Sequence, residues 1–362
     1  MPSISLCQGK FQIDESQVVD PRADQTLNGI PVDQLADAVR SSFEQPIDFP
    51  PIAQAVMAED VVAIAVEPST PCGLTVARQV ADWFVAAGND RSRITILCAD
   101  KHADKDSDFV IHDATDAEQM AMLVVDAKGN PLHVNRILFD ADLVVPIGTG
   151  DNRSLQNSIC PAFCGLETKK QIERLRPSDA AGVARMINSN LGVFWQVRIV
   201  TMPGEQVVNV MTGSSESVLE RSAQAGGQVW ELQIDRPAGM VLATIEAATS
   251  QSWANLRSAI LTADKASAAD APLVMCTDLS GKPSVIWPTP DNQSKRQDSE
   301  LAEVFQRRHV FLASRLTQDT TEQFGFGYLE NSEQIKKLID QHESCLLLRD
   351  AHRVGLQTRE AV

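Results

Sequence analysis

The stretch Val61-Val-Ala-Ile-Ala-Val66 is a nearly continuous apolar run, and the loop Glu67-Pro-Ser-Thr-Pro-Cys-Gly73 follows it. The segment from Leu74 to Ala87 then repeats apolar residues at helical spacing, and Ile94 to Cys98 is a second apolar run. Two short apolar runs joined by an amphipathic helix are typical of a βαβ unit with parallel strands. This stretch therefore predicts an α/β fold with largely parallel sheets.

The same alternation continues on both sides of a turn-rich boundary near 234–239, Ile-Asp-Arg-Pro-Ala-Gly. Before it, we predict strands at 108–112 and 141–148, with a helix at 116–125 between them. The turn Met202-Pro-Gly-Glu205 predicts a β-hairpin, because Pro fixes one backbone angle and Gly permits a positive one. The hairpin strands are expected at 193–200 and 206–210, and the strands after the boundary at 240–245, 273–277, 310–314 and 345–348.

We therefore expect two α/β domains around a central cleft. The N-terminal domain would span residues 1–236 and contain the additional β-hairpin. The C-terminal domain would span 237–344, and a final strand near 345–358 would return to the N-terminal domain.

The charge balance restricts the partners. The 362 residues include 32 Lys and Arg against 48 Asp and Glu, a net charge of −16. Repulsion between like charges argues against nucleic acid or an anionic membrane as a partner. No apolar run approaches the roughly 20 residues of a membrane span, and Met1 to Lys10 lacks the features of a signal peptide. We therefore expect a cytoplasmic protein whose seven cysteines are reduced and packed as small hydrophobes.

Polar residues that follow a predicted parallel strand are candidates for ligand binding, because open α/β sheets bind at the carboxyl ends of their strands. Glu67, Ser69 and Thr70 follow the first strand. The alternative is a turn that only caps the helix from Leu74. His102 follows the next strand and is suited to proton transfer near neutral pH, although an exposed loop histidine is the plainer interpretation.

Two further groups lie around residues 160–170. Cys160 and Cys164 are four residues apart, but no histidine lies between His133 and His309, so packing explains them better than a metal site. Lys169 and Lys170 either hold a carboxylate or phosphate or solvate the start of a helix.

Several segments together resemble the nickel-pincer-dependent lactate racemase family. The loop Glu67-Pro-Ser-Thr-Pro71 is similar to its Asp-x-Thr-Arg-Pro segment, and Val110 to Asp116 to its His-Asp stretch. The run Gly129-Asn-Pro-Leu-His-Val-Asn-Arg136, followed by Ala141-Asp-Leu-Val-Val-Pro-Ile-Gly148, is the most specific match. The resemblance implies two domains around a cleft and racemisation or epimerisation of 2-hydroxy acids through a nickel pincer nucleotide.

The resemblance also implies that most of the catalytic residues are replaced. Thr70 stands where the family has an arginine, Ser158 where it has a second acid–base histidine, and Thr168 where it has the lysine that tethers the cofactor. The expected nickel-binding histidine is absent from 176–194. His102 and Lys169 are the candidates for retained catalytic residues, while Glu67, Ser69, Thr70, Ser158, Thr168 and Lys170 are candidates for substrate or cofactor binding.

Three functions are consistent with these residues. The first is a divergent member that binds a small anionic metabolite or nucleotide in the cleft, without the pincer, a metal site or another cofactor. The second is an active 2-hydroxy-acid racemase or epimerase, an isomerase that uses His102, Lys169 or Lys170, and Glu67, in rearranged roles. The third is a non-catalytic subunit of a racemase system. The sequence does not indicate an oligomeric state.

Overall fold

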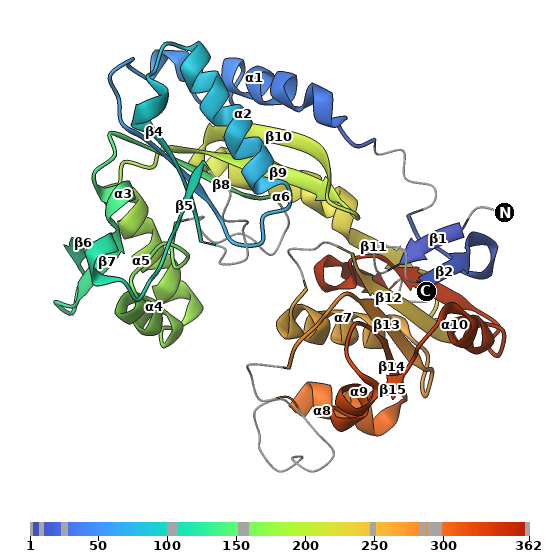
Figure 1. Cartoon of the computed structure of the whole chain (residues 1–362). Helices are drawn as coiled ribbons and strands as arrows, with labels where there is room; N and C mark the ends of the chain where they lie inside the picture. The colour runs from blue at the N-terminus through green and yellow to red at the C-terminus, as the bar shows by residue number, and fades with distance from the viewer. Residues whose placement is uncertain are drawn as a thin grey trace. The chain divides into compact units, whose positions relative to one another are not determined.

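The computed structural model describes residues 3–6, 11–22, 28–99, 108–150, 159–246, 251–282, 287 and 299–358. The chain forms two compact units (Figure 1), one made of Leu27–Gln228 and the other of Met1–Thr26 together with Val229–Val362. Both are mixed α/β structures with largely parallel sheets, which confirms the predicted fold class. Within the described part of the chain, no helix combines the length and the apolar character needed to cross a bilayer.

A six-stranded sheet organises the unit Leu27–Gln228. Its strand order is β10-β9-β8-β3-β4-β5, and all neighbours are parallel except the hairpin β9–β10. The predicted hairpin is thereby confirmed. The strands are β3 (Val62–Val66), β4 (Ile94–Cys98), β5 (Phe109–Ile111), β8 (Leu143–Thr149), β9 (Trp195–Met202) and β10 (Gln206–Ser214).

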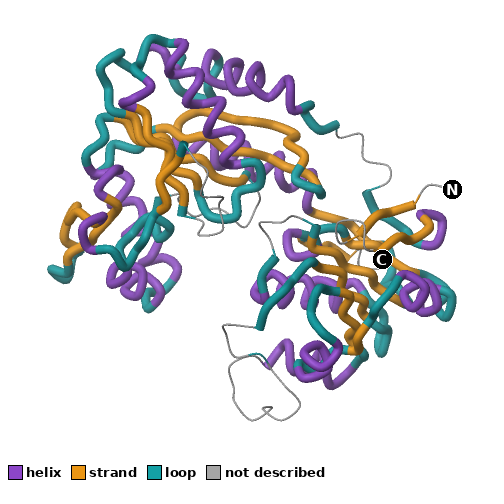
Figure 2. The backbone as a smooth tube through the Cα atoms, viewed as in Figure 1, coloured by secondary structure: helices purple, strands orange, loops and turns teal. Residues whose placement is uncertain are grey.

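Helices cover both faces of this sheet (Figure 2), which is why its central strands are apolar throughout. Val62, Ile64 and Val66 of β3 pack with α1 and α2, whereas Ala63 and Ala65 pack with α3, α4 and α5. The helices are α1 (Leu35–Glu44), α2 (Gly73–Ala86), α3 (Arg136–Phe139), α4 (Leu166–Glu173), α5 (Pro177–Asn190) and, leading into the other unit, α6 (Ser215–Trp230).

The helix predicted at 116–125 is wrong. The structure has a strand, β6 (Met120–Val125), paired antiparallel with β7 (Pro131–Asn135). The turn between them is stabilised by the Asp126 side chain, which accepts hydrogen bonds from the backbone N–H groups of Lys128 and Asn130. Gly129 has a φ of +83°, which favours glycine. These turn interactions explain why the segment forms a β-hairpin and not a helix.

A five-stranded parallel sheet organises the other unit, with the order β15-β14-β13-β12-β16. One face packs on α10 and on the N-terminal hairpin β1–β2, and the other on α7. The strands of this unit are β1 (Ser3–Leu6), β2 (Phe11–Asp14), β11 (Glu231–Ile234), β12 (Met240–Ile245), β13 (Leu273–Thr277), β14 (Val310–Ala313), β15 (Gly327–Tyr328), β16 (Cys345–Leu348) and β17 (Gly355–Thr358). The helices are α7 (Trp253–Ala266), α8 (Ser299–Arg307), α9 (Gln318–Gln323) and α10 (Ser332–Ile339).

The structure divides the chain differently from the sequence-based prediction. The boundary lies between Gln228 and Val229, within α6, and Met1–Thr26 belongs with the C-terminal residues. Strand β16 lies beside β12, and β17 pairs with β11, so the segment 345–358 remains in the C-terminal unit. The predicted return to the N-terminal domain does not occur.

Candidate functional site

The carboxyl ends of β3 and β8 form the topological switch point of the six-stranded sheet. From β3 the chain continues to β4 and β5 on one side, and then returns to place β8 on the other side. Ligands of open α/β sheets bind at such a point, outside the carboxyl ends of the strands. Glu67 lies there, directly after β3, and its backbone N–H donates to Ile147 O of β8 at 2.9 Å.

A buried arginine holds the Glu67 carboxylate. Arg198, in the middle of β9, has a fully buried side chain and lies 3.5 Å from Glu67 Oε2. It also donates to the carbonyl oxygen of Thr149 at 3.2 Å and to Gln196 Oε1 at 2.9 Å. Because Glu67 keeps 20 % of its side chain exposed, the pair presents an oriented carboxylate at the switch point. Sequence reasoning missed Arg198, although an arginine within an otherwise apolar strand was a signal.

The loop after β3 is shaped by packing and not by capping of α2. The N-cap residue is Cys72, which has a φ of +55° and makes no side-chain capping bond. A Cβ at Gly73 would lie 2.7 Å from Val66 Cγ1, so this position requires glycine. Ser69 is exposed, whereas Thr70 is buried. The Thr70 hydroxyl has no hydrogen-bond partner in the described part of the chain, which is costly for a buried polar group.

Three candidate binding or catalytic residues, Thr168, Lys169 and Lys170, lie on α4. Thr168 is buried, and its Oγ1 accepts a hydrogen bond from the backbone N–H of His133 at 2.9 Å. Lys170 is exposed and pairs with Glu167 at 2.8 Å, as expected of a solvated helix start. Lys169 is half-buried near Cys164. Binding or catalysis by either lysine stays a prediction.

The cysteine pair has the expected packing role. Cys160 and Cys164 are free, buried thiols. A hydrogen bond with Cys160, together with burial, raises the pKa of Cys164 well above its usual range, although the charge of Lys169 acts in the opposite direction. A thiol in such surroundings is protonated and unreactive at neutral pH.

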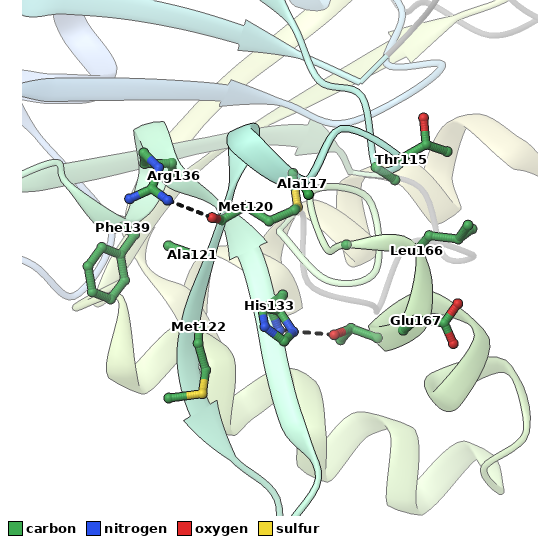
Figure 3. A pocket seen from close by; sticks show the side chains of 13 residues that line it. Thr115, Ala117, Met120, Ala121, Met122, His133, Arg136, Phe139, Leu166 and Glu167 are labelled. Carbon is green, nitrogen blue, oxygen red and sulfur yellow. Dashed lines mark hydrogen bonds between the residues drawn. The ribbon is translucent and has the colours of Figure 1, made fainter.

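A surface depression of about 680 Å³ lies beside the β6–β7 hairpin and the start of α4 (Figure 3). Two of its polar side chains form hydrogen bonds within the protein. Arg136 donates to the carbonyl oxygens of Glu118 and Met120, and the Thr115 hydroxyl donates to Asp113. We therefore place the candidate site at the switch point and not in this depression.

Comparison with solved structures gives the fold a name. The apoprotein of the lactate racemase from Thermoanaerobacterium thermosaccharolyticum matches with a TM-score of 0.68 at 14 % identity, covering 98 % of this chain and 99 % of that chain. This chain has the lactate racemase fold. A protein from Thermotoga maritima matches with a TM-score of 0.58 at 14 % identity, covering 91 % and 99 % of the two chains. No protein-family model and no curated protein matches the sequence.

Position 168 of this lactate-racemase-like chain does not offer the lysine that the family uses to tether the nickel pincer. The resemblance aligns Thr168 with the tethering lysine, but a threonine offers no amine, and its hydroxyl is bonded to His133. Among the described residues, no three or more His, Cys, Asp or Glu side chains are grouped to hold a metal ion. His102 and Ser158 lie outside the described residues.

The two aligned threonines should respond differently to valine. Thr168→Val removes the acceptor of the His133 N–H, and we expect a loss of about 1–2 kcal/mol in the free energy of unfolding. Thr70→Val removes a hydroxyl without a described partner, so stability should stay equal or rise. Urea denaturation followed by circular dichroism measures both. An equal loss in the two variants would contradict the assignment.

Proposed function

We propose that this lactate-racemase-like protein binds a small anionic metabolite or a nucleotide at the carboxyl edge of its six-stranded sheet, without nickel-pincer catalysis. The observation that supports this most is the Glu67 carboxylate at the switch point, held by a fully buried arginine. Burying a guanidinium is costly, and here the arrangement orients one loop carboxylate that is 20 % exposed. Preorganisation of this kind is expected of a binding site.

The chemistry of the described residues favours a ligand that carries a hydroxyl. An ionised carboxylate only accepts hydrogen bonds, so Glu67 would accept the hydroxyl of a 2-hydroxy acid or of a ribose. The Thr70 hydroxyl supplies a further donor in the same loop.

Thermal shift measurements on the full chain test the proposal. The panel pairs hydroxy acids with analogues that lack the hydroxyl, namely D- and L-lactate with propionate and malate with succinate, and adds AMP. A ligand present at about 100 times its Kd stabilises the native state by about 2.7 kcal/mol. We expect one hydroxylated anion to raise the Tm while its analogue does not, and Thr70→Val to reduce the shift. The absence of a shift across the panel would overturn the proposal and favour a non-catalytic subunit.

A separate experiment tests the absence of pincer catalysis. The chain is co-expressed with the enzymes that make the nickel pincer, purified, and analysed for nickel and visible absorbance. We expect a colourless, nickel-free protein, because Thr168 cannot form the tether. Stoichiometric nickel with a visible chromophore would overturn this part of the proposal and favour an active 2-hydroxy-acid racemase.

A further inference from the structure

The second sheet has a switch point of its own. From β12 the chain continues to β13, β14 and β15 on one side, while β16 joins the other side of β12. All these neighbours are parallel, so their carboxyl ends meet at one edge. Helix α7 connects β12 to β13 and therefore begins at this edge (Figure 1). This arrangement lies entirely within one compact unit.

Two carboxylates follow neighbouring strands at this edge, and only one is fully engaged. Glu246, after β12, accepts two hydrogen bonds from Arg349, at 2.8 and 2.7 Å, and one from the Thr244 hydroxyl at 3.0 Å. Its backbone N–H donates to Asp350 at 2.7 Å. The Glu246 carboxylate is therefore fully used by hydrogen bonds within the protein, at the carboxyl ends of β12 and β16.

The other carboxylate keeps an unused oxygen. Asp278, after β13, is 8 % exposed, and its Oδ1 accepts a hydrogen bond from Arg315 Nε at 3.0 Å. Its Oδ2 is buried and has no hydrogen-bond partner in the part of the chain that the structure describes. A buried carboxylate oxygen without a donor is costly, and such an exception calls for an explanation. A ligand that donates a hydrogen bond to Asp278 Oδ2 would remove this cost.

Asp278 lies beside the start of α7. Its backbone N–H donates to Gln251 Oε1 at 2.9 Å, and Gln251 directly precedes the N-cap residue Ser252. The Ser252 side chain accepts from the backbone N–H of Asn255, so α7 begins as a regular capped helix. The first N–H groups of a helix have no acceptor within the helix, and their dipoles favour a phosphate.

The order strand, helix, strand and carboxylate is the arrangement that binds a nucleotide in doubly wound folds. There the helix start takes the phosphate, and an acidic residue at the end of the second strand accepts the ribose hydroxyls. The segment from Glu246 to Ser252 contains no glycine, so the glycine fingerprint is absent. A nucleotide site at this edge is indicated instead by the strand order, the start of α7 and the unused oxygen of Asp278.

We propose that the carboxyl edge of β12 and β13 binds a nucleoside phosphate. The ribose hydroxyls donate to Asp278, and the phosphate lies at the start of α7. Arg315, which is half-exposed and donates to Asp278 Oδ1, brings a positive charge to this edge that favours the phosphate. This site is separate from the one at Glu67, and neither proposal depends on the other.

Isothermal titration calorimetry of the full chain with ADP and with 2′,3′-dideoxyADP tests the ribose contact directly. We expect ADP to bind about tenfold more tightly, because a hydrogen bond to a charged group is lost in the analogue. Equal affinities, or no binding of ADP at millimolar concentration, would overturn the proposal. This comparison uses the unmodified chain and needs no variant to fold.

A matched pair of variants then locates the site. Asp278→Asn keeps the acceptor for Arg315 but replaces the unused oxygen with a donor, so ADP affinity should fall about tenfold and the preference over the analogue should vanish. Asp264→Asn changes a carboxylate near the other end of α7, which pairs with Arg307 and Arg308, and should leave both unchanged. Loss of ADP binding in Thr70→Val with retention in Asp278→Asn would place the nucleotide at the first site and refute the inference.

Discussion

Replacing Glu67 with glutamine should lower the free energy of unfolding by about 3 kcal/mol, because it takes the Glu67 charge away from the buried Arg198 guanidinium. Glutamine keeps the size of the side chain and one acceptor oxygen, so the loss reports the charge and not a cavity. The Arg198 side chain has no exposed surface, so water cannot replace the carboxylate. For a unit of this size the change corresponds to about 6–12 °C in Tm.

The control is an exposed ion pair on α1. Asp37 pairs with Arg40, and both side chains are more than half exposed, so Asp37→Asn should change stability by no more than about 0.5 kcal/mol. The double variant Glu67→Gln, Arg198→Met should recover part of the loss, since it removes the buried guanidinium charge as well. Thermal denaturation followed by circular dichroism measures all three variants. A Glu67→Gln effect as small as that of Asp37→Asn would show that the buried pair does not stabilise the unit.

Most of the strands that sequence reasoning located are buried on both faces, although β5 and β10 are not. A run such as Val61 to Val66 has no polar face, and a strand covered by helices on both sides needs none. The run Met120 to Val125 was misassigned because a short apolar run has no decisive period. Its alternation appears only in the structure, where Ala121 is buried and Met122 is 58 % exposed. The turn at Asp126 and Gly129 was the better signal.

The division into units could not be read from the sequence because distant pairings set it. Val19 donates to the carbonyl oxygen of Cys345 at 2.8 Å and accepts from Leu347 at 2.9 Å. These bonds attach the N-terminal segment to a strand more than 300 residues later. No local pattern marks such a partner, whereas the Pro-Gly turn at 203–204 marked its hairpin within a few residues.

In the candidate site, too, residues marked by local sequence were found and a residue with a distant partner was not. Glu67 and Thr70 were located because the end of a parallel strand is a fixed place for ligands. Arg198 was missed because its partner is 131 residues away in the sequence. A chain that is 14 % identical to a lactate racemase and keeps its fold is consistent with this, since the buried apolar positions set the fold and a few polar positions set the chemistry.

Replacing Phe43 with alanine should cost about 3–5 kcal/mol, the largest loss that we expect from one substitution. Phe43 of α1 is fully buried, and its ring makes edge contacts with Trp83, Phe84 and Trp195, at centroid distances of 4.7, 6.3 and 5.6 Å. Alanine would leave a cavity between α1, α2 and the start of β9, the strand that carries Arg198.

The neighbour of Trp195 supplies the control. Phe194 is 68 % exposed, so Phe194→Ala removes the same ring at a site where solvent already reaches it. We expect a change within about 0.5 kcal/mol. Urea denaturation monitored by tryptophan fluorescence compares the two variants, because Trp83 and Trp195 lie against the Phe43 ring. Similar urea midpoints for the two variants would contradict the central role of this aromatic cluster. They would indicate that the sheet, and not the Phe43 ring, holds β9 in place.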